Sequence, residues 1–159
     1  MFVYTLQLED NCWYVGSTTR PPERLAQHKA GNGSAWTSAH PPVAGFSSLT
    51  RVESNNAADA RLQEDMEVKR LMQRHGIERV RGGSYAQTTL NDDAIRALQR
   101  ELRHADDACL RCGRSSHWVQ NCYATYDVSG NLIVDEGDES SDSSSSTESN
   151  YYDSDLSNF

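Results

Sequence analysis

FVYTLQLEDNCWYVG, residues 2–16, begins with a segment in which apolar side chains recur at every second position. This alternation places four of them on one face of an extended chain: Phe2, Tyr4, Leu6 and Leu8. The acidic and polar residues 9–11 then turn the chain into a second extended segment, residues 12–17. We therefore expect a β-hairpin at the start of the chain.

A short helix is expected next, from about Pro22 to Ala30. Proline suits a first helical turn, and Gly31 suits the end of a helix. The following residues 31–34, GNGS, predict a loop. Residues 43–53 carry three large apolar side chains among Ser and Thr, which favours a third strand.

Two longer helices are predicted further along. From Asn56 to His75 apolar residues recur at steps of three and four, and Gly76 ends the pattern. A further helix is expected from about Asp92 to His104, where Ile95, Leu98 and Leu102 share one face.

The formal net charge of −8 comes from one end of the chain. Eight acids and no Lys or Arg follow from Asp135 onward, whereas the preceding residues hold fifteen acids and fifteen basic residues. The same segment is rich in Ser and poor in apolar residues, so we expect a disordered acidic tail over residues 128–159. Such a tail could be phosphorylated or could mask basic residues, but passive solubilisation is the default interpretation.

The composition also indicates in which cellular compartment the protein is expected. No apolar run approaches the roughly 18–20 residues that a bilayer-crossing helix needs, and the N-terminus lacks a basic region before an apolar run. Three of the four cysteines stand at metal-ligand spacing, so disulfides are not expected. We expect a soluble protein of a reducing compartment, the cytoplasm or the nucleus.

Five polar side chains are candidates for one catalytic site. The hairpin supplies Tyr4 and Tyr14, and the next helix supplies Arg24 and His28, which share a face because they lie four residues apart. Glu64 falls at the centre of the apolar stripe of its helix, where a carboxylate needs a metal ion or a cation such as Arg24 as a partner.

Each of these side chains also has a structural interpretation. Tyr4 and Tyr14 could be ordinary strand aromatics, and Arg24 and His28 could be solvated helix residues. Glu64 could pair with Arg61 or Lys69 at the edge of its helix. Glu67, one turn further on, is a weaker metal candidate for which a solvated role is expected.

Taken together, the residues resemble the GIY-YIG nucleases. The two motifs of that family correspond to residues 2–4, FVY, and residues 14–16, YVG. The helix Arg and His of the family match Arg24 and His28, and its metal-binding Glu matches Glu64. Two further segments, GSAWT at residues 33–37 and VRGGSY at residues 80–85, resemble the corresponding segments of small family members that carry a zinc knuckle, as found in large DNA viruses.

The resemblance implies an α+β fold in which a three-stranded antiparallel sheet is flanked by helices. It also implies hydrolysis of phosphodiesters with one divalent ion, Mg²⁺ or Mn²⁺, held by Glu64. Tyr4 is then the general base, His28 its proton acceptor, Arg24 the clamp on the scissile phosphate and Tyr14 a second hydrogen-bond donor. Two departures are noted: Phe2 replaces the first-motif Gly, and Glu78-Arg79 stand where many relatives have an Asn.

A separate metal site is predicted near the end of the folded part. Its ligands follow the spacing C-x2-C-x4-H-x4-C, typical of a retroviral-type zinc knuckle: Cys109, Cys112, His117 and Cys122. Trp118 could stack on an unpaired base while Arg111 and Arg114 contact phosphates. The alternatives are a purely structural zinc site or a protein-binding surface.

The predicted organisation is a nuclease domain over residues 1–86, a connecting helix over 87–108, the knuckle over 109–122 and the acidic tail. The expected function is metal-dependent cleavage of DNA, with RNA or single-stranded DNA as further targets of the knuckle. The alternatives are an inactive nucleic-acid-binding protein and a protein-interaction adaptor built on the tail and the knuckle.

Overall fold

The structure, a computed structural model, describes residues 1–54 and 56–134. Most of the predicted acidic tail therefore lies outside the described residues. Residues 128–134, which the sequence assigned to that tail, are described: Leu132 forms a β-bridge with Tyr126, and the backbone N–H of Asn131 donates to the Asp127 carboxylate.

The N-terminal hairpin is confirmed. Strand β1 (Phe2–Leu8) pairs antiparallel with β2 (Trp13–Thr18), and this register sets Tyr4 opposite Gly16. Between the strands lies the 3₁₀ helix η1 (Glu9–Asn11), in which Asp10 and Asn11 have φ values of 58° and 57°. Asp and Asn tolerate this left-handed region better than most residues, so the polar step suits the turn.

The sheet has four strands rather than the three that the family resemblance implied. Strand β3 (Pro42–Arg51) pairs antiparallel with β1, and β4 (Val80–Gly82) pairs parallel with β2, which gives the order β3-β1-β2-β4. Strand β4 has only three residues, too few for an apolar period to show in the sequence. The α+β class is confirmed.

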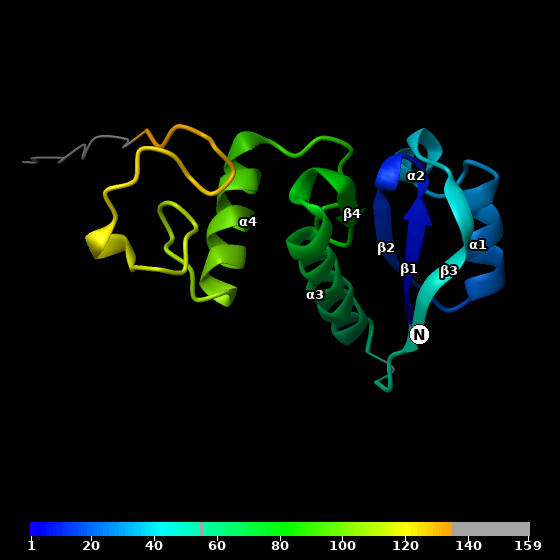
Figure 1. The fold of residues 1–159 in the computed structure, drawn as a ribbon. Helices are drawn as coiled ribbons and strands as arrows, with labels where there is room; N and C mark the ends of the chain where they lie inside the picture. Colours follow the sequence, from blue (N-terminus) through cyan, green and yellow to red (C-terminus); the bar gives the residue numbers. More distant parts are fainter. Residues whose placement is uncertain (55, 135–159) are drawn as a thin grey trace, which may run out of the picture.

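Helices cover both faces of the sheet (Figure 1). Helix α1 (Pro21–Lys29) and the short α2 (Ala35–Ala39) lie over the face that carries Tyr4 and Tyr14, whose core also includes Leu25 and Trp36. Helix α3 (Ala57–His75) lies over the opposite face, where its apolar side chains pack against Val3 and Val15. All three predicted helices are present: two of them are α1 and α3, and the third, predicted over residues 92–104, is described next. Helix α2 was not predicted.

Helix α4 (Asp92–Ala105) packs against α3 and extends the same core. Leu98 is 1% exposed, which corresponds to roughly 1.5–3 kcal/mol of hydrophobic stabilisation for a side chain of this size. At the rim, Lys69 Nζ lies 2.6 Å from a carboxylate oxygen of Glu101. The predicted connecting helix is therefore a packed part of the fold, and the following C-terminal module, residues 106–134, lies on the side of α4 that faces away from the sheet (Figure 1).

The remaining regular elements are two further 3₁₀ helices, η2 (Ile77–Arg79) before β4 and η3 (Val119–Asn121) in the C-terminal module. Across the described residues, no helix combines the length and the apolar character needed to cross a membrane.

Candidate functional site

Tyr4 is the centre of a buried hydrogen-bonded set. Its hydroxyl oxygen lies 2.8 Å from Nε2 of His28 and accepts a hydrogen bond of 3.1 Å from Nε of Arg24. The register of β1 and β2 and the four-residue step along α1 bring these three side chains together. The convergence of Tyr4, Arg24 and His28 that the sequence predicted is therefore present.

Thr37 of α2 orients the imidazole of His28. Its hydroxyl oxygen lies 2.8 Å from Nδ1 of His28 and 3.2 Å from the carbonyl oxygen of Ser34, to which it donates. Because the hydroxyl proton goes to that carbonyl, we assign the proton to Nδ1 of His28, which donates to Thr37. The Nε2 lone pair of His28 then accepts the proton of the Tyr4 hydroxyl.

Burial sets the protonation of both partners. Loss of water raises the pKa of Tyr4 to about 12, although the hydrogen bond from Arg24 opposes the shift. Burial also lowers the pKa of His28 to about 4, helped by the positive charge of Arg24. In the absence of ligands, Tyr4 is therefore a neutral phenol at pH 7 and His28 a neutral base.

Two glycines allow this close packing. A Cβ atom at Gly16 would lie 2.4 Å from the Tyr4 hydroxyl oxygen, and one at Gly33 would lie 2.0 Å from Nδ1 of His28. Both distances are shorter than any tolerable contact, so only glycine fits at these positions. The carbonyl oxygen of Gly33 also accepts a hydrogen bond of 3.3 Å from Arg24, which helps to hold the guanidinium.

Tyr14 completes the aromatic cluster. Its ring centre lies 6.3 Å from that of Tyr4 and 5.1 Å from that of His28. Burial raises the pKa of its phenol, while the charge of Arg24 opposes the shift and the charge of Glu64 adds to it. Tyr14 therefore keeps its proton at neutral pH and can donate a hydrogen bond.

Glu64 of α3 is buried, with 8% of its surface exposed. The backbone N–H of Gly83 donates a hydrogen bond of 2.9 Å to its Oε1 atom. Within the described part of the chain its carboxylate has no ion pair, neither with Arg24 nor with the alternatives Arg61 and Lys69. The partner of this inward carboxylate is thus a backbone amide, which leaves it able to bind a cation.

The Glu64 carboxylate lines a small hollow at the end of β2. This hollow, of about 260 Å³, is also lined by Ser17, Arg61, Asp65, Gly83 and Ser84. The charge of Glu64 raises the pKa of Tyr4 together with the larger effect of burial. The other four predicted residues are joined by hydrogen bonds and ring contacts, but none of them lines the hollow beside Glu64.

The loop after β4 holds this side of the hollow in a way that the sequence did not indicate. Besides the bond from Gly83, the backbone N–H of Ser84 donates to Asp65 at 2.7 Å and its hydroxyl donates to the other carboxylate oxygen at 2.6 Å. Gly83 has φ +48°, and a Cβ there would meet Asp65. By contrast, Glu67 pairs with Arg70 through two hydrogen bonds and takes no part in the site.

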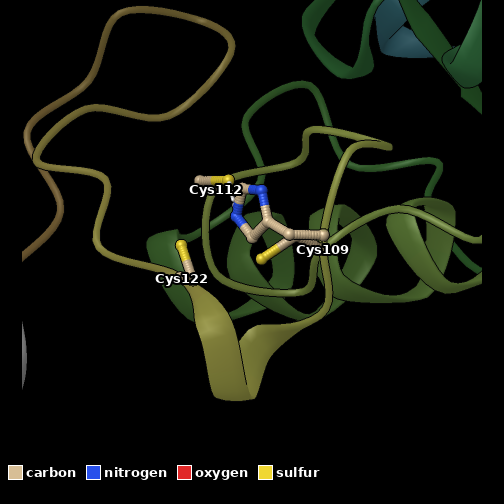
Figure 2. Close-up of side chains that lie close together, drawn as sticks. Cys109, Cys112 and Cys122 are labelled. Atoms are coloured by element: carbon tan, nitrogen blue, oxygen red, sulfur yellow. Dashed lines mark hydrogen bonds between the residues drawn. The ribbon is translucent and has the colours of Figure 1, made fainter.

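The four predicted zinc ligands converge in the C-terminal module. One ligand atom from each of Cys109, Cys112, His117 and Cys122 lies within 4.8 Å of the others. Figure 2 shows the three labelled cysteine sulfurs around an imidazole ring. The set of three thiols and one imidazole matches the tetrahedral donors that structural Zn²⁺ sites use.

The residues predicted to bind nucleic acid differ in exposure. Trp118 is 60% exposed, and Arg114 is exposed while it donates to the carbonyl oxygen of Tyr126 at 3.0 Å. Arg111 is half-buried and donates to the carbonyl oxygen of Ala124 at 2.7 Å. Arg111 therefore stabilises the module through a hydrogen bond inside it. Its position in the sequence, beside Cys112, did not indicate this role.

Arg103 joins α4 to the zinc ligands. It donates to the carbonyl oxygens of Leu110 and Arg111 and forms an ion pair of 3.1 Å with the buried Asp127. Asp127 in turn accepts from the backbone N–H groups of Ser129 and Asn131. The C-terminal module thus extends past the last cysteine and is fastened to α4.

Comparison with known proteins agrees with this division. A family model described as the GIY-YIG catalytic domain matches residues 1–63, and one described as a GAG-polyprotein viral zinc-finger matches residues 105–133. The chain matches no solved structure.

Two curated relatives each match about half of this chain. A UPF0213 protein of Natronomonas pharaonis is 34% identical over 70 residues, which span 44% of this chain and 78% of the relative. A UPF0213 protein of Halalkalibacterium halodurans is 30% identical over 90 residues, which span 55% of this chain and 92% of the relative. The chain belongs to the GIY-YIG family of nuclease domains, and its matches span most of the length of these UPF0213 relatives.

Proposed function

We propose that the chain is a metal-dependent endonuclease that hydrolyses the phosphodiester bonds of DNA. One observation supports this proposal most strongly. The Tyr4 hydroxyl is hydrogen-bonded to His28 and Arg24, and the buried Glu64 carboxylate, whose charge raises the pKa of Tyr4 in addition to the larger effect of burial, lines a polar hollow. A phosphodiester resists attack because of its own negative charge, so a catalyst needs a base, a cationic clamp and a metal site together.

The donor set around Glu64 fits a magnesium ion. A carboxylate oxygen is a hard ligand, and Mg²⁺ binds through one or two carboxylates while it keeps several waters. Glu64 forms no ion pair among the described residues, and the hollow beside it is polar, with the carboxylate of Asp65 and the guanidinium of Arg61 in its wall. When bound there, Mg²⁺ or Mn²⁺ would neutralise charge on the phosphoryl oxygens.

Tyr4 and His28 would move the proton. The Tyr4 hydroxyl gives its proton to Nε2 of His28, and the phenolate then accepts a proton from the attacking water. The pKa values of about 12 and about 4 make this transfer unfavourable in the free protein. Positive charge, from a metal ion bound near Glu64 and from the Arg24 guanidinium, would therefore have to stabilise the phenolate.

Arg24 and Tyr14 would bind the scissile phosphate. Arg24 presents a planar guanidinium whose Nε already contacts Tyr4, so a phosphate bound by its remaining donors would sit next to the base. The Tyr14 phenol, which keeps its proton, would donate a hydrogen bond to a phosphoryl oxygen or to water. Both contacts strengthen as charge develops on those oxygens.

The C-terminal module would add affinity for nucleic acid. We propose that Cys109, Cys112, His117 and Cys122 bind one Zn²⁺ and that the exposed Trp118 stacks on a base. All four cysteines are unpaired, which suits a reducing compartment such as the cytoplasm or the nucleus. In this proposal the nuclease domain, residues 1–86, cleaves the nucleic acid, and the zinc knuckle, residues 109–122, binds it. Residues 87–108 connect the two parts.

The test is cleavage of supercoiled plasmid and of a branched or single-stranded DNA with Mg²⁺ and with EDTA. Wild type should cut only with metal, and Glu64→Gln should not cut. The matched control is Glu67→Gln, on the same helix but paired with Arg70, which should cut like wild type. Binding without cutting in every sample would identify an inactive nucleic-acid-binding protein, and absence of binding would favour the adaptor alternative.

A further inference from the structure

We propose that a single strand of nucleic acid follows one continuous groove from α4 across the C-terminal module. Its phosphates would contact Arg96 and Arg100, and two of its bases would stack on Tyr123 and Trp118. This inference rests on the proposed nucleic-acid binding by the C-terminal module and adds the path of the strand. The path includes α4, of which the two family matches cover only residue 105.

Three hollows adjoin along this path. The first, about 540 Å³, lies between α4 and the end of the described chain and shares Arg111 and Ile133 with the second. The second, about 550 Å³, reaches Tyr123 and shares Val119 with the third. The third, about 440 Å³, contains Trp118. The shared lining residues place the three hollows next to one another, in an order that runs from α4 to η3.

The first part of the groove is positively charged. Three guanidinium groups line it, those of Arg96, Arg100 and Arg111, against the single carboxylate of Asp93, which pairs with Arg96. Arg96 and Arg100 lie one helical turn apart on α4, so they project from the same face. Arg100 is exposed and, among the described residues, forms no ion pair with a carboxylate. A polyanion is the ligand that this end would attract.

The second part of the groove carries exposed aromatic rings. Tyr123 is 92% exposed and Trp118 is 60% exposed, on either side of Val119. Neither aromatic side chain is part of the core of the described fold, because most of the surface of each is exposed to solvent. A basic groove followed by exposed aromatic faces is the arrangement that proteins use to hold single strands, since phosphates meet the cations while unpaired bases stack.

The test is fluorescence anisotropy of a short labelled oligothymidylate with the zinc-loaded full chain over a range of salt. Oligouridylate run in parallel distinguishes RNA from DNA. Arg100→Gln should weaken binding and reduce the slope of log affinity against log salt by about 0.7, because one phosphate contact is lost. Arg74→Gln, an exposed arginine on α3 outside the groove, should leave the slope unchanged.

Tyr123→Ala should weaken binding by about 5- to 100-fold with the salt slope unchanged, because stacking is lost but no charge is removed. Leu62→Ala, which removes an exposed apolar side chain of α3, is the matched control and should bind like wild type. Normal affinity in both Arg100→Gln and Tyr123→Ala, with Trp118→Ala still impaired, would overturn the groove while leaving the proposed function intact. No binding by wild type would overturn both.

Discussion

The hydroxyl oxygen of Tyr4 lies 2.8 Å from Nε2 of His28, although the two residues are 24 positions apart in the chain. Arg24 also contacts this oxygen, to which its Nε atom donates a hydrogen bond of 3.1 Å. Tyr4 is thus placed between a proton acceptor and a cation. The predictions below test whether this arrangement does the chemistry.

Replacement of Tyr4 by Phe should abolish most cleavage while the fold is kept, because Phe fills the same space but cannot carry a proton. We expect nicking of plasmid to slow by roughly 10²- to 10⁴-fold, the usual contribution of a general base. Affinity for single-stranded DNA, measured by anisotropy, should change little. A Tyr4→Phe protein that nicks at more than about a tenth of the wild-type rate would remove Tyr4 from the mechanism.

His28 should stay neutral well below its ordinary pKa. Burial and Arg24 lower that pKa to about 4, so an NMR titration of the imidazole should give a midpoint near 4. A midpoint near the ordinary value of about 6.5 would contradict the buried environment.

The same shift predicts how stability depends on pH. Between about pH 4 and 6.5, His28 is protonated in the unfolded chain but not in the folded chain. The free energy of unfolding therefore has its full value above this range and decreases as the pH falls through it. The loss amounts to at most about 3 kcal/mol. Denaturant unfolding of wild type and His28→Gln should show a steeper acid loss in wild type, and equal losses would refute the prediction.

Thr37→Val should impair cleavage without removing any residue that touches DNA in our proposal. Valine cannot accept from Nδ1 of His28, so the imidazole loses the partner that keeps Nε2 free of protons. We expect about a 10-fold lower rate and an altered pH-rate profile. Thr37→Ser, which keeps the hydroxyl, should restore both, and a Ser variant as slow as Val would point to packing instead.

Gly16→Ala should destabilise the fold and slow cleavage. The new methyl group would lie 2.4 Å from the Tyr4 hydroxyl oxygen, and relief of such overpacking typically costs about 1–3 kcal/mol. Gly45→Ala in β3 is the control, because its methyl group would lie 4.0 Å from Cδ2 of Leu25, which is an ordinary van der Waals contact. Gly16→Ala should therefore unfold at a lower denaturant concentration and nick plasmid more slowly than Gly45→Ala.

Asp127→Ala should loosen the zinc-binding module. The change leaves Arg103 unpaired in a site where the two side chains are 16% and 9% exposed, and breaking such a pair typically costs about 3–5 kcal/mol. A lower concentration of chelator should then suffice to unfold the module, as followed by the release of Zn²⁺ from the protein. Glu53→Ala, an exposed acid after β3, should behave as wild type.

Local patterns were enough to predict much of this protein. The alternation in residues 2–8 specifies a strand, and the polar step after it specifies the turn, because both depend only on neighbouring residues. The four zinc ligands were predictable for a similar reason. A short segment can wrap one ion only if its ligands stand at set intervals, so the spacing itself carries the information.

Other features depend on contacts between distant segments, and no local pattern reports them. The family resemblance identified Glu64, but only the fold shows that the backbone N–H of Gly83, nineteen residues away, is its partner. Likewise, Thr37 matters because α2 packs over α1, and Gly16 matters because β2 lies against the ring of Tyr4. Backbone amides and packing distances have no sequence signature, so the tertiary structure alone sets these contacts.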